Sequence, residues 1–346
     1  MKGWKKRGMA LLMTGVMTAM MCSCGAAEET KEEETAGNEG KDLQKITFVL
    51  DWTPNTNHTG LYVAMDKGYF EDAGLEVEVV QPPEDGAEVL VASGKAQFGV
   101  SFQDYIAPAL VGEEPLGISA VAAIIQHNTS GIVSRKGEGM DVPKGLEGHK
   151  YATWDLPVEK ATIRQVMKAD GGDFDKVELI PSTVTDEVSA LESKSVDAIW
   201  IFYGWAGIAC QIAGLETDYF AFADVDPVFD FYTPVVIGNN EFMEENPETA
   251  KAFMAALSHG YEDAIEDPEG AAQILMEAAP ELKDSEELVV ESQKYLAEQY
   301  QADADRWGEF DADRWSGFYE WLNTNGLLEG EVDPMAGFTN DYLPAK

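Results

Sequence analysis

The sequence predicts an α/β fold of two similar lobes with mostly parallel sheets and a helical C-terminal part. Three observations support this prediction: strand and helix patterns alternate from residue 46, the alternation starts again at residue 149, and strand patterns end at Glu241. Strand–helix–strand units at this rhythm form right-handed crossovers in parallel sheets. The chain has 346 residues, of which 45% are hydrophobic, and this length suits two lobes better than one.

The elements of the first series follow from local patterns. Ile46 to Leu50 is a short apolar run between polar residues, as expected for a buried strand, and Leu75 to Val80 alternates as a strand. Between them, residues 60–72 have apolar side chains at helical spacing, and Gly74 ends the helix. The series continues with a helix over 86–93, a strand over 97–102 and an apolar run over 117–125.

The second series repeats the first. It predicts strands over 150–154, 177–180 and 196–202 and helices over 157–170 and 184–193. An offset of 99 residues aligns Glu88 and the strand FGVSF with Glu187 and the strand DAIWIF. The shared order of helix, turn and strand predicts two lobes that are built alike.

Helical patterns fill the rest of the chain, over 247–265, 268–278, 283–300 and 311–325. We interpret Trp307, Trp315 and Trp321 as packing residues, because an aromatic stripe on a helix usually faces a core. Two lobes with a helical annex suggest a clamshell that the chain crosses near 130–135 and near 233–238. We therefore assign residues 45–132 and 237–346 to lobe 1 and residues 133–236 to lobe 2.

The N-terminus predicts export and a lipid anchor. Four basic residues precede an apolar run over 9–21, which is too short for a transmembrane helix and typical of a signal peptide over 1–23. Small residues around Cys24 resemble a bacterial lipobox, although Met21 and Cys22 are unusual there. The alternative is a plain signal peptide. We expect residues 24–44 to be a lipidated flexible tether that holds an extracytoplasmic protein on the cell membrane.

Charge and cysteine content exclude several classes of partner. The formal net charge is −39, and removal of residues 1–23 would take four basic and no acidic residues and leave −43. Nothing in such a chain could neutralise phosphates, so we expect no nucleic acid partner. Three cysteines cannot form a disulfide framework. With Cys24 lipidated, Cys210 has no partner and is expected to be a buried thiol.

Polar and aromatic side chains follow the predicted strands, at the edge where open α/β sheets bind ligands. The loop over 51–60 combines Trp52 with amides and His58, although residues 57–59 could also serve only to cap the next helix. Similar side chains follow the strands near 101, 125, 154 and 202. The predicted ligand residues are Trp52, Asn55, Asn57, His58, Tyr62, Ser101, Gln103, Asp104, His127, Asn128, Trp154, Glu159, Tyr203, Trp205 and Tyr232.

These loops favour a flat, neutral, nitrogen-rich ring as the ligand. Aromatic side chains supply stacking and amides supply orientation, whereas Lys and Arg, which a sulfonate or phosphate would require, are absent from them. The four histidines show no metal-binding spacing, and no phosphate loop or nucleophile elbow is present. We therefore expect no metal, no cofactor and no catalytic residue.

The segments KITFVLDWTPNTNHTGLYVAMDKGYFEDAGLEVEVV, ASGKAQFGVSF and NNEFMEENPE resemble the solute-binding proteins of thiamine-pyrimidine ABC importers, in the SsuA/THI5-like, NMT1-like family. The resemblance covers roughly residues 45–340. It implies a periplasmic-binding-protein-like type II clamshell that binds an aminopyrimidine between its lobes. It also implies a monomer that works with permease and ATPase subunits and touches the membrane through its lipid anchor only.

The same fold occurs in hydroxymethylpyrimidine phosphate synthases, and departures from their pattern disfavour an enzyme. Ser101 and Tyr105 stand where the synthases have a pyridoxal-phosphate lysine and a histidine, and residues 229–233 replace a cysteine-rich run. Ala206 stands where relatives often have an acidic residue, which leaves the ring in question. The alternatives are such an enzyme, a receptor-linked sensor, or a binding protein for another solute such as a sulfonate or riboflavin.

Overall fold

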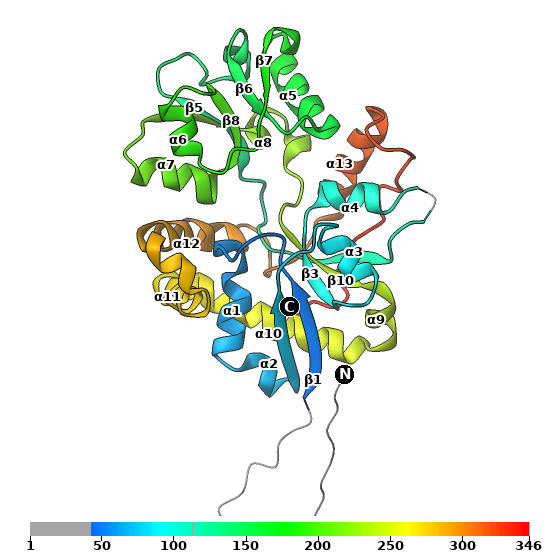
Figure 1. The fold of residues 1–346 in the computed structure, drawn as a ribbon. Coiled ribbons are helices and arrows are strands. Elements are labelled where there is room, and N and C mark those ends of the chain that lie inside the picture. Colours follow the sequence, from blue (N-terminus) through cyan, green and yellow to red (C-terminus); the bar gives the residue numbers. More distant parts are fainter. Residues whose placement is uncertain (1–42, 113, 346) are drawn as a thin grey trace, which may run out of the picture. The chain divides into compact units, whose positions relative to one another are not determined.

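The computed structural model describes residues 43–112 and 114–345. They form two five-stranded sheets (Figure 1). The first has the strand order β2-β1-β3-β10-β4, made of Leu75–Val80, Gln44–Val49, Phe98–Ser101, Val235–Asn239 and Ile118–Ala123. The second has the order β7-β6-β8-β5-β9, made of Glu178–Pro181, Lys150–Thr153, Ala198–Phe202, Ser130–Arg135 and Thr217–Ala221.

Each sheet is mixed, with four strands in one direction and one reversed. In the first sheet β1 is parallel to β2 and β3, and β10 is antiparallel to both of its neighbours. In the second sheet β6 is parallel to β7 and β8, and β5 is the antiparallel strand. The reversed strand is in each case the first one formed after the chain leaves the other sheet. The prediction of mostly parallel sheets therefore holds for strand direction, although half of the neighbouring pairs are antiparallel.

The two sheets have equivalent strand orders, which confirms the repeat expected from the sequence. Strands β1, β2 and β3 of the first sheet occupy the positions of β6, β7 and β8 in the second. The helices α3 (Ala87–Ala92) and α6 (Glu187–Glu192), which the offset of 99 residues aligns, precede β3 and β8. Side chains at the ends of β1 and β3 can therefore be compared directly with those at the ends of β6 and β8.

The chain crosses between the sheets through residues 124–129 and 222–234. The expected crossings near 130–135 and 233–238 are mostly strands β5 and β10 themselves, because their apolar residues pair within a sheet. The second crossing contains the short helices α8 (Phe222–Val225) and η5 (Pro227–Phe229) and a cis peptide bond between Thr233 and Pro234. The lobe boundaries at 132 and 236 remain predictions, although they fall inside β5 of the second sheet and β10 of the first.

Helices flank the sheets close to the expected positions. The predicted helix over 60–72 is two helices, α1 (Thr59–Asp66) and α2 (Tyr69–Asp72), because Gly68 between them has a φ of 75°. The sequence missed the strand β9 and four helices, Gln103–Ala109 (α4), Ile208–Ile212 (α7), α8 and Asn240–Glu245 (α9). The other helices are α4 (Gln103–Ala109), α5 (Pro157–Ala169), α7 (Ile208–Ile212), α9 (Asn240–Glu245), α10 (Pro247–Glu266), α11 (Pro268–Ala278), α12 (Glu286–Tyr300) and α13 (Ala312–Thr324).

The cores are apolar and rich in aromatic side chains. Trp307, Trp315 and Trp321 are buried, as the stripe on the C-terminal helix predicted. Cys210 is a buried free thiol, and burial raises its pKa to about 11, which keeps the thiol protonated near neutral pH. None of the helices in the described part of the chain has both the length and the apolar character needed to cross a membrane.

The predicted signal peptide, the lipidation site Cys24 and nearly all of the predicted tether lie outside the described residues. The tether prediction extended to residue 44, but Gln44 is the first residue of β1 and pairs with Leu75 of β2. Its polar side chain is exposed at the start of the strand, which is why the local pattern did not reveal it.

Candidate functional site

Four exposed aromatic side chains mark the carboxyl ends of equivalent strands in the two sheets. In the first sheet, Trp52 follows β1 and is 55% exposed, and Tyr105 follows β3 and is 49% exposed. In the second sheet, Trp154 follows β6 and is 43% exposed, and Phe202 ends β8 and is 39% exposed. No other aromatic side chain of the described residues belongs to the large exposed hydrophobic side chains. Large exposed rings at the ligand-binding edge of both sheets favour a ring-binding site.

His58 holds the loop after β1 together through hydrogen bonds within it. The His58 ring is buried, and its Nδ1 accepts the backbone N–H of Asn55 at 3.2 Å. Its Nε2 must therefore carry the proton, which it donates to Asp51 Oδ1 at 2.7 Å. Asn55 caps the short helix η1 (Thr56–His58) and accepts the N–H of Asn57. His58 and Asn55 thus shape the loop that presents Trp52.

The end of β3 carries a pair of acids. The buried hydroxyl of Ser101 donates a hydrogen bond to Glu88 Oε1 from α3. Asp104, in the first turn of α4, is half-buried, and this burial raises its pKa to about 7, with a further increase from the nearby Glu88 carboxylate. A half-buried carboxyl beside the exposed Tyr105 is suited to accept an N–H from a ligand.

Two further predicted residues support the scaffold beside this pair. Gln103 is fully buried, and its side chain donates to the carbonyl of Trp315 at 2.8 Å and accepts the N–H of Tyr232 at 2.9 Å. The Tyr232 hydroxyl is also buried and accepts the N–H of Asp311 at 2.7 Å. Burial raises the pKa of Tyr232 to about 12. Both side chains hold α13 and the chain before β10 against the first sheet.

Glu159 fixes the turn between β6 and α5. Its buried carboxylate accepts four hydrogen bonds, between 2.7 and 3.1 Å, from the hydroxyls of Tyr151 and Thr153 and the backbone N–H groups of Trp154 and Leu156. The two oxygens have about four acceptor positions, and all are used. The backbone of Trp154 is anchored here, while its ring stays exposed and contacts Trp200 at 5.7 Å between centroids.

The loop after β8 forms a π-helical turn, η4 (Tyr203–Gly207), that packs against the C-terminal helices. The Tyr203 ring contacts Tyr219 of β9 and Tyr295 of α12, with centroid distances of 4.9 and 5.3 Å. Trp205 packs against an apolar cluster that contains Tyr62 of α1. Burial raises the pKa of Tyr62. This cluster brings together two predicted ligand residues that follow strands of different sheets.

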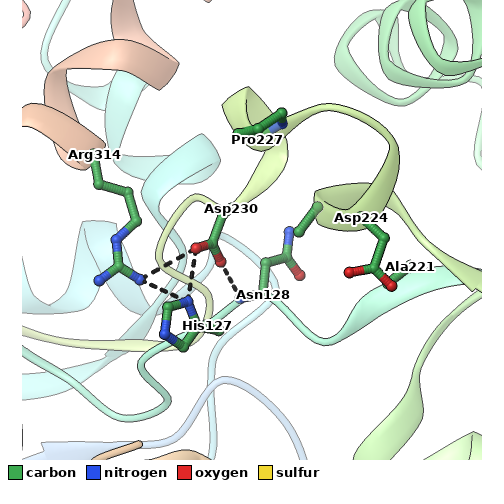
Figure 2. A pocket seen from close by; sticks show the side chains of 8 residues that line it. His127, Asn128, Ala221, Asp224, Pro227, Asp230 and Arg314 are labelled. Carbon is green, nitrogen blue, oxygen red and sulfur yellow. Dashed lines mark hydrogen bonds and ion pairs between the residues drawn. The ribbon is translucent and has the colours of Figure 1, made fainter. Parts of the chain in front are cut away.

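His127 and Asn128 lie in the first crossing and line a pocket of about 520 Å³ (Figure 2). His127 Nδ1 lies 2.7 Å from Asp230 Oδ2 of the second crossing, and its Nε2 lies 2.9 Å from Asp303 Oδ1. These carboxylates raise the pKa of His127 above its ordinary value. Arg314 of α13 points into the same group and contacts Asp230 at 3.5 Å.

Asn128 is committed to the backbone, because its side chain donates to the carbonyl of Phe229 and accepts the N–H of Ser130. Both polar side chains therefore tie the two crossings together. None of the exposed rings at the strand ends lines this pocket.

The predicted residues thus divide into two groups. Trp52, Asp104, Trp154, Tyr203 and Trp205 present rings or a carboxyl at the ends of strands, whereas the buried polar residues mainly hold loops. Tyr105, Phe202 and Glu88 belong to the same edge but were not among the predicted ligand residues. The offset of 99 residues, which placed the helix of Glu88 before β3, was the available signal for Glu88. In the described ranges, no group of three or more His, Cys, Asp or Glu side chains is placed to hold a metal.

Comparisons with known proteins agree with this architecture. A formylaminopyrimidine-binding protein of Halalkalibacterium halodurans is 27% identical over 312 residues, covering 89% of this chain and 93% of the relative. The 4-amino-5-hydroxymethyl-2-methylpyrimidine phosphate synthase THI11 of Saccharomyces cerevisiae is 24% identical, covering 86% of this chain and 88% of the synthase.

Solved structures show the same fold. The putative periplasmic sulfonate-binding protein SsuA of Methylobacillus flagellatus KT superposes with a TM-score of 0.64 at 18% identity, covering 88% of this chain and 93% of that chain. This likeness confirms the predicted periplasmic-binding-protein-like type II fold. The family model described as NMT1/THI5 like matches residues 55–271, which is more than half of the chain. This protein therefore belongs to the NMT1/THI5-like family.

Proposed function

We propose that this protein is the extracytoplasmic solute-binding component of an ABC importer and binds an aminopyrimidine of the thiamine-precursor type. The observation that carries the proposal is the set of exposed aromatic side chains at equivalent strand ends of both sheets: Trp52, Tyr105, Trp154 and Phe202. A flat ring held between two lobes needs one stacking surface from each. The named formylaminopyrimidine-binding relative, which covers nearly the whole chain, supports the same class of ligand.

Asp104 is the acid that we assign to the amino group of this ligand. Glu159 is another acid among the predicted ligand residues, but all of its acceptor positions are used within the β6–α5 turn. Asp104 is half-buried beside Tyr105, and Glu88 adds negative charge to the same spot. Two acids here compensate for Ala206, which follows Trp205 where relatives often have an acid. A donor-bearing ring can satisfy these carboxyls, whereas an oxyanion would be repelled.

We propose that the protein binds its solute without converting it. The synthase relatives raise the alternative of an enzyme. A Schiff base with pyridoxal phosphate needs a lysine amine, and the residue at the corresponding position is Ser101, whose hydroxyl is buried and donates to Glu88. The residues present therefore do not fit that cofactor.

The proposal includes the partners and the place of the protein. Cys24 would carry the lipid anchor, residues 25–43 would form the tether, and permease and ATPase subunits would receive the solute from a monomeric binding protein. The lobes would extend over residues 45–132 with 237–346 and over 133–236. Ligand that contacts both lobes would stabilise the closed arrangement through its higher affinity for it.

A ligand panel tests the proposal. Purified protein is screened by thermal shift with formylaminopyrimidine, 4-amino-5-hydroxymethyl-2-methylpyrimidine, thiamine and riboflavin, and with taurine, alkanesulfonates, nitrate and pyrimidine phosphates. Hits are titrated by calorimetry, because a ligand that binds only the folded state raises its stability in proportion to the logarithm of concentration. We expect stabilisation by aminopyrimidines.

Three outcomes would count against the proposal. Stabilisation by the anions alone would place the protein with sulfonate or nitrate binders. Stabilisation by riboflavin alone would indicate a flavin-binding protein. An absorbance band with pyridoxal phosphate that borohydride removes, together with product formation, would support the enzyme.

A further inference from the structure

We propose that Ser292 of α12 is a positioning residue that couples the candidate ligand loop after β1 to the one after β8. Its hydroxyl lies between Thr56 in the first loop and Gly204 in the second. These two loops follow strands of different sheets. The inference deepens the proposed function, because it concerns how the two halves of the same site are held in register.

The carbonyl oxygen of Gly204 fixes the direction of both hydrogen bonds made by the Ser292 hydroxyl. The carbonyl oxygen of Gly204 can only accept, so the single Ser292 proton is donated to it. Thr56 Oγ1 lies 2.6 Å from Ser292 Oγ, and Thr56 must therefore be the donor in that pair. The result is a chain from Thr56 through Ser292 to Gly204 in which each bond polarises the next. Ser292 is fully buried and Thr56 nearly so, which makes the chain sensitive to the loss of any member.

The rest of α12 reinforces the same two contacts. Ser292, Leu296 and Tyr300 are four residues apart and share one face of the helix. The Tyr300 hydroxyl donates to the Thr56 carbonyl at 2.5 Å. A Cβ added to Gly204 would lie 2.7 Å from Leu296 Cδ2, so η4 approaches α12 closely at this residue.

The coupled segments contain predicted ligand residues. Thr56 lies in the loop that presents Trp52, and Gly204 lies between Tyr203 and Trp205 in η4. Short π-helical segments such as η4 occur frequently at functional sites. Ser292 thus connects two loops that carry predicted ligand residues, and it is itself fully buried.

Hydrogen exchange measured by mass spectrometry tests the coupling without a ligand. We expect Ser292→Ala to raise exchange about tenfold in peptides that cover 55–58 and 203–207, the scale of one buried hydrogen bond, and to leave β1 and β8 unchanged. Ser258→Ala is the matched control, because Ser258 is a buried helical serine whose hydroxyl bonds only to Glu262 of its own helix in the described structure. It should leave both peptides unchanged.

A double-mutant cycle separates coupling from local loosening. Thr56→Val should raise exchange at 203–207 in the wild-type background and have no further effect there once Ser292→Ala is present. Additive effects of the two substitutions on exchange at 203–207 would overturn the inference. So would a Ser292→Ala variant in which exchange rises in only one of the two loops.

Titration with formylaminopyrimidine supplies the functional readout. Ser292→Ala should weaken binding about threefold to tenfold, mainly through faster dissociation. If the wild-type protein binds neither this probe nor 4-amino-5-hydroxymethyl-2-methylpyrimidine, the proposed function fails, while the exchange cycle still decides whether Ser292 couples the loops. Unchanged affinity in a variant whose loops exchange faster would refute the positioning role.

Discussion

At the scale of single residues, exposure distinguishes the side chains that can meet a ligand from those that hold the loops. Trp52 is 55% exposed, so its removal should leave the fold intact. We expect Trp52→Ala to weaken binding of formylaminopyrimidine at least about tenfold, because stacking adds about 0.5–1.5 kcal/mol to the area that the ring buries. Met335→Ala, at an equally exposed apolar position, is the control. Calorimetry that finds equal affinities in Trp52→Ala and the control would remove Trp52 from the site.

Asp104 is the residue whose environment conflicts most with its usual charge. Burial raises its pKa to about 7, so between about pH 4 and pH 7 the unfolded chain has lost a proton that the folded protein keeps. Stability is lost over this window as the pH rises. The free energy of unfolding of Asp104→Asn, relative to that of the wild type, should therefore increase with pH. This difference should be about 1–2 kcal/mol larger at pH 8 than at pH 5. Urea unfolding measures this difference in the free energy of unfolding. A difference that does not depend on pH would show that Asp104 is not the titrating group.

The same residue makes a prediction about ligand binding. A carboxylate accepts an N–H more strongly than a carboxylic acid, so aminopyrimidine affinity should rise between pH 6 and pH 8. Asp104→Asn should weaken binding and abolish this rise. An affinity that falls over the same interval in the wild type would argue against contact between Asp104 and the amino group.

At the scale of elements, the turn between β6 and α5 depends on one carboxylate. Glu159→Gln would turn one acceptor oxygen into an N–H₂ group facing two donors. We expect a loss of about 2–4 kcal/mol in the free energy of unfolding, since donors are left unpaired in a buried site. Glu192→Gln, at an exposed position in α6, should change stability by less than about 0.5 kcal/mol. Equal effects of the two substitutions would contradict this account.

Local sequence patterns were sufficient to predict most helices and strands. They could not predict contacts between residues that lie far apart in the chain. The alternation in Leu75–Val80 identified β2 to the residue, because one face of that strand is buried and the other exposed. Strand β9 (Thr217–Ala221) was missed because it is short and starts with polar residues. At the candidate site, the exposed rings Trp52 and Trp154 followed from their place after strands. The role of His58 inside its loop and the contact of Thr56 with Ser292 depend on three-dimensional packing.

At the scale of the whole molecule, two independent links hold the sheets in relation to each other. Ser292 connects the loops at the ends of β1 and β8, and His127 connects the two crossings through Asp230. The first link depends on neutral hydroxyl groups, whereas the second depends on the charge of an imidazole. Changes of pH therefore act on the crossings and on Asp104, and leave the Ser292 chain unaltered.

The pH dependence of overall stability follows from these groups. Carboxyls whose pKa is lowered, such as Asp197 and Asp263, are ionised in both states above about pH 5.5 and contribute a constant term. The raised pKa of His127, which Asp230 and Asp303 cause and Arg314 opposes, gives stability that is present below about pH 6.5 and is lost as the pH rises through the higher folded value. Asp104 acts in the same direction, and so does self-repulsion in a chain of net charge −39.

We therefore expect the free energy of unfolding to be lower at pH 8 than at pH 5.5, by about 1–3 kcal/mol. Salt at 0.5 M should reduce the part that arises from surface repulsion and from the partly exposed His127. The part of this pH-dependent loss of stability that arises from the half-buried Asp104 should persist in salt and disappear in Asp104→Asn. His127→Gln should remove only a part of the loss that salt also reduces. Urea unfolding of the three proteins at both pH values and two salt concentrations tests this, and a wild-type stability that rises toward pH 8 would contradict both assignments.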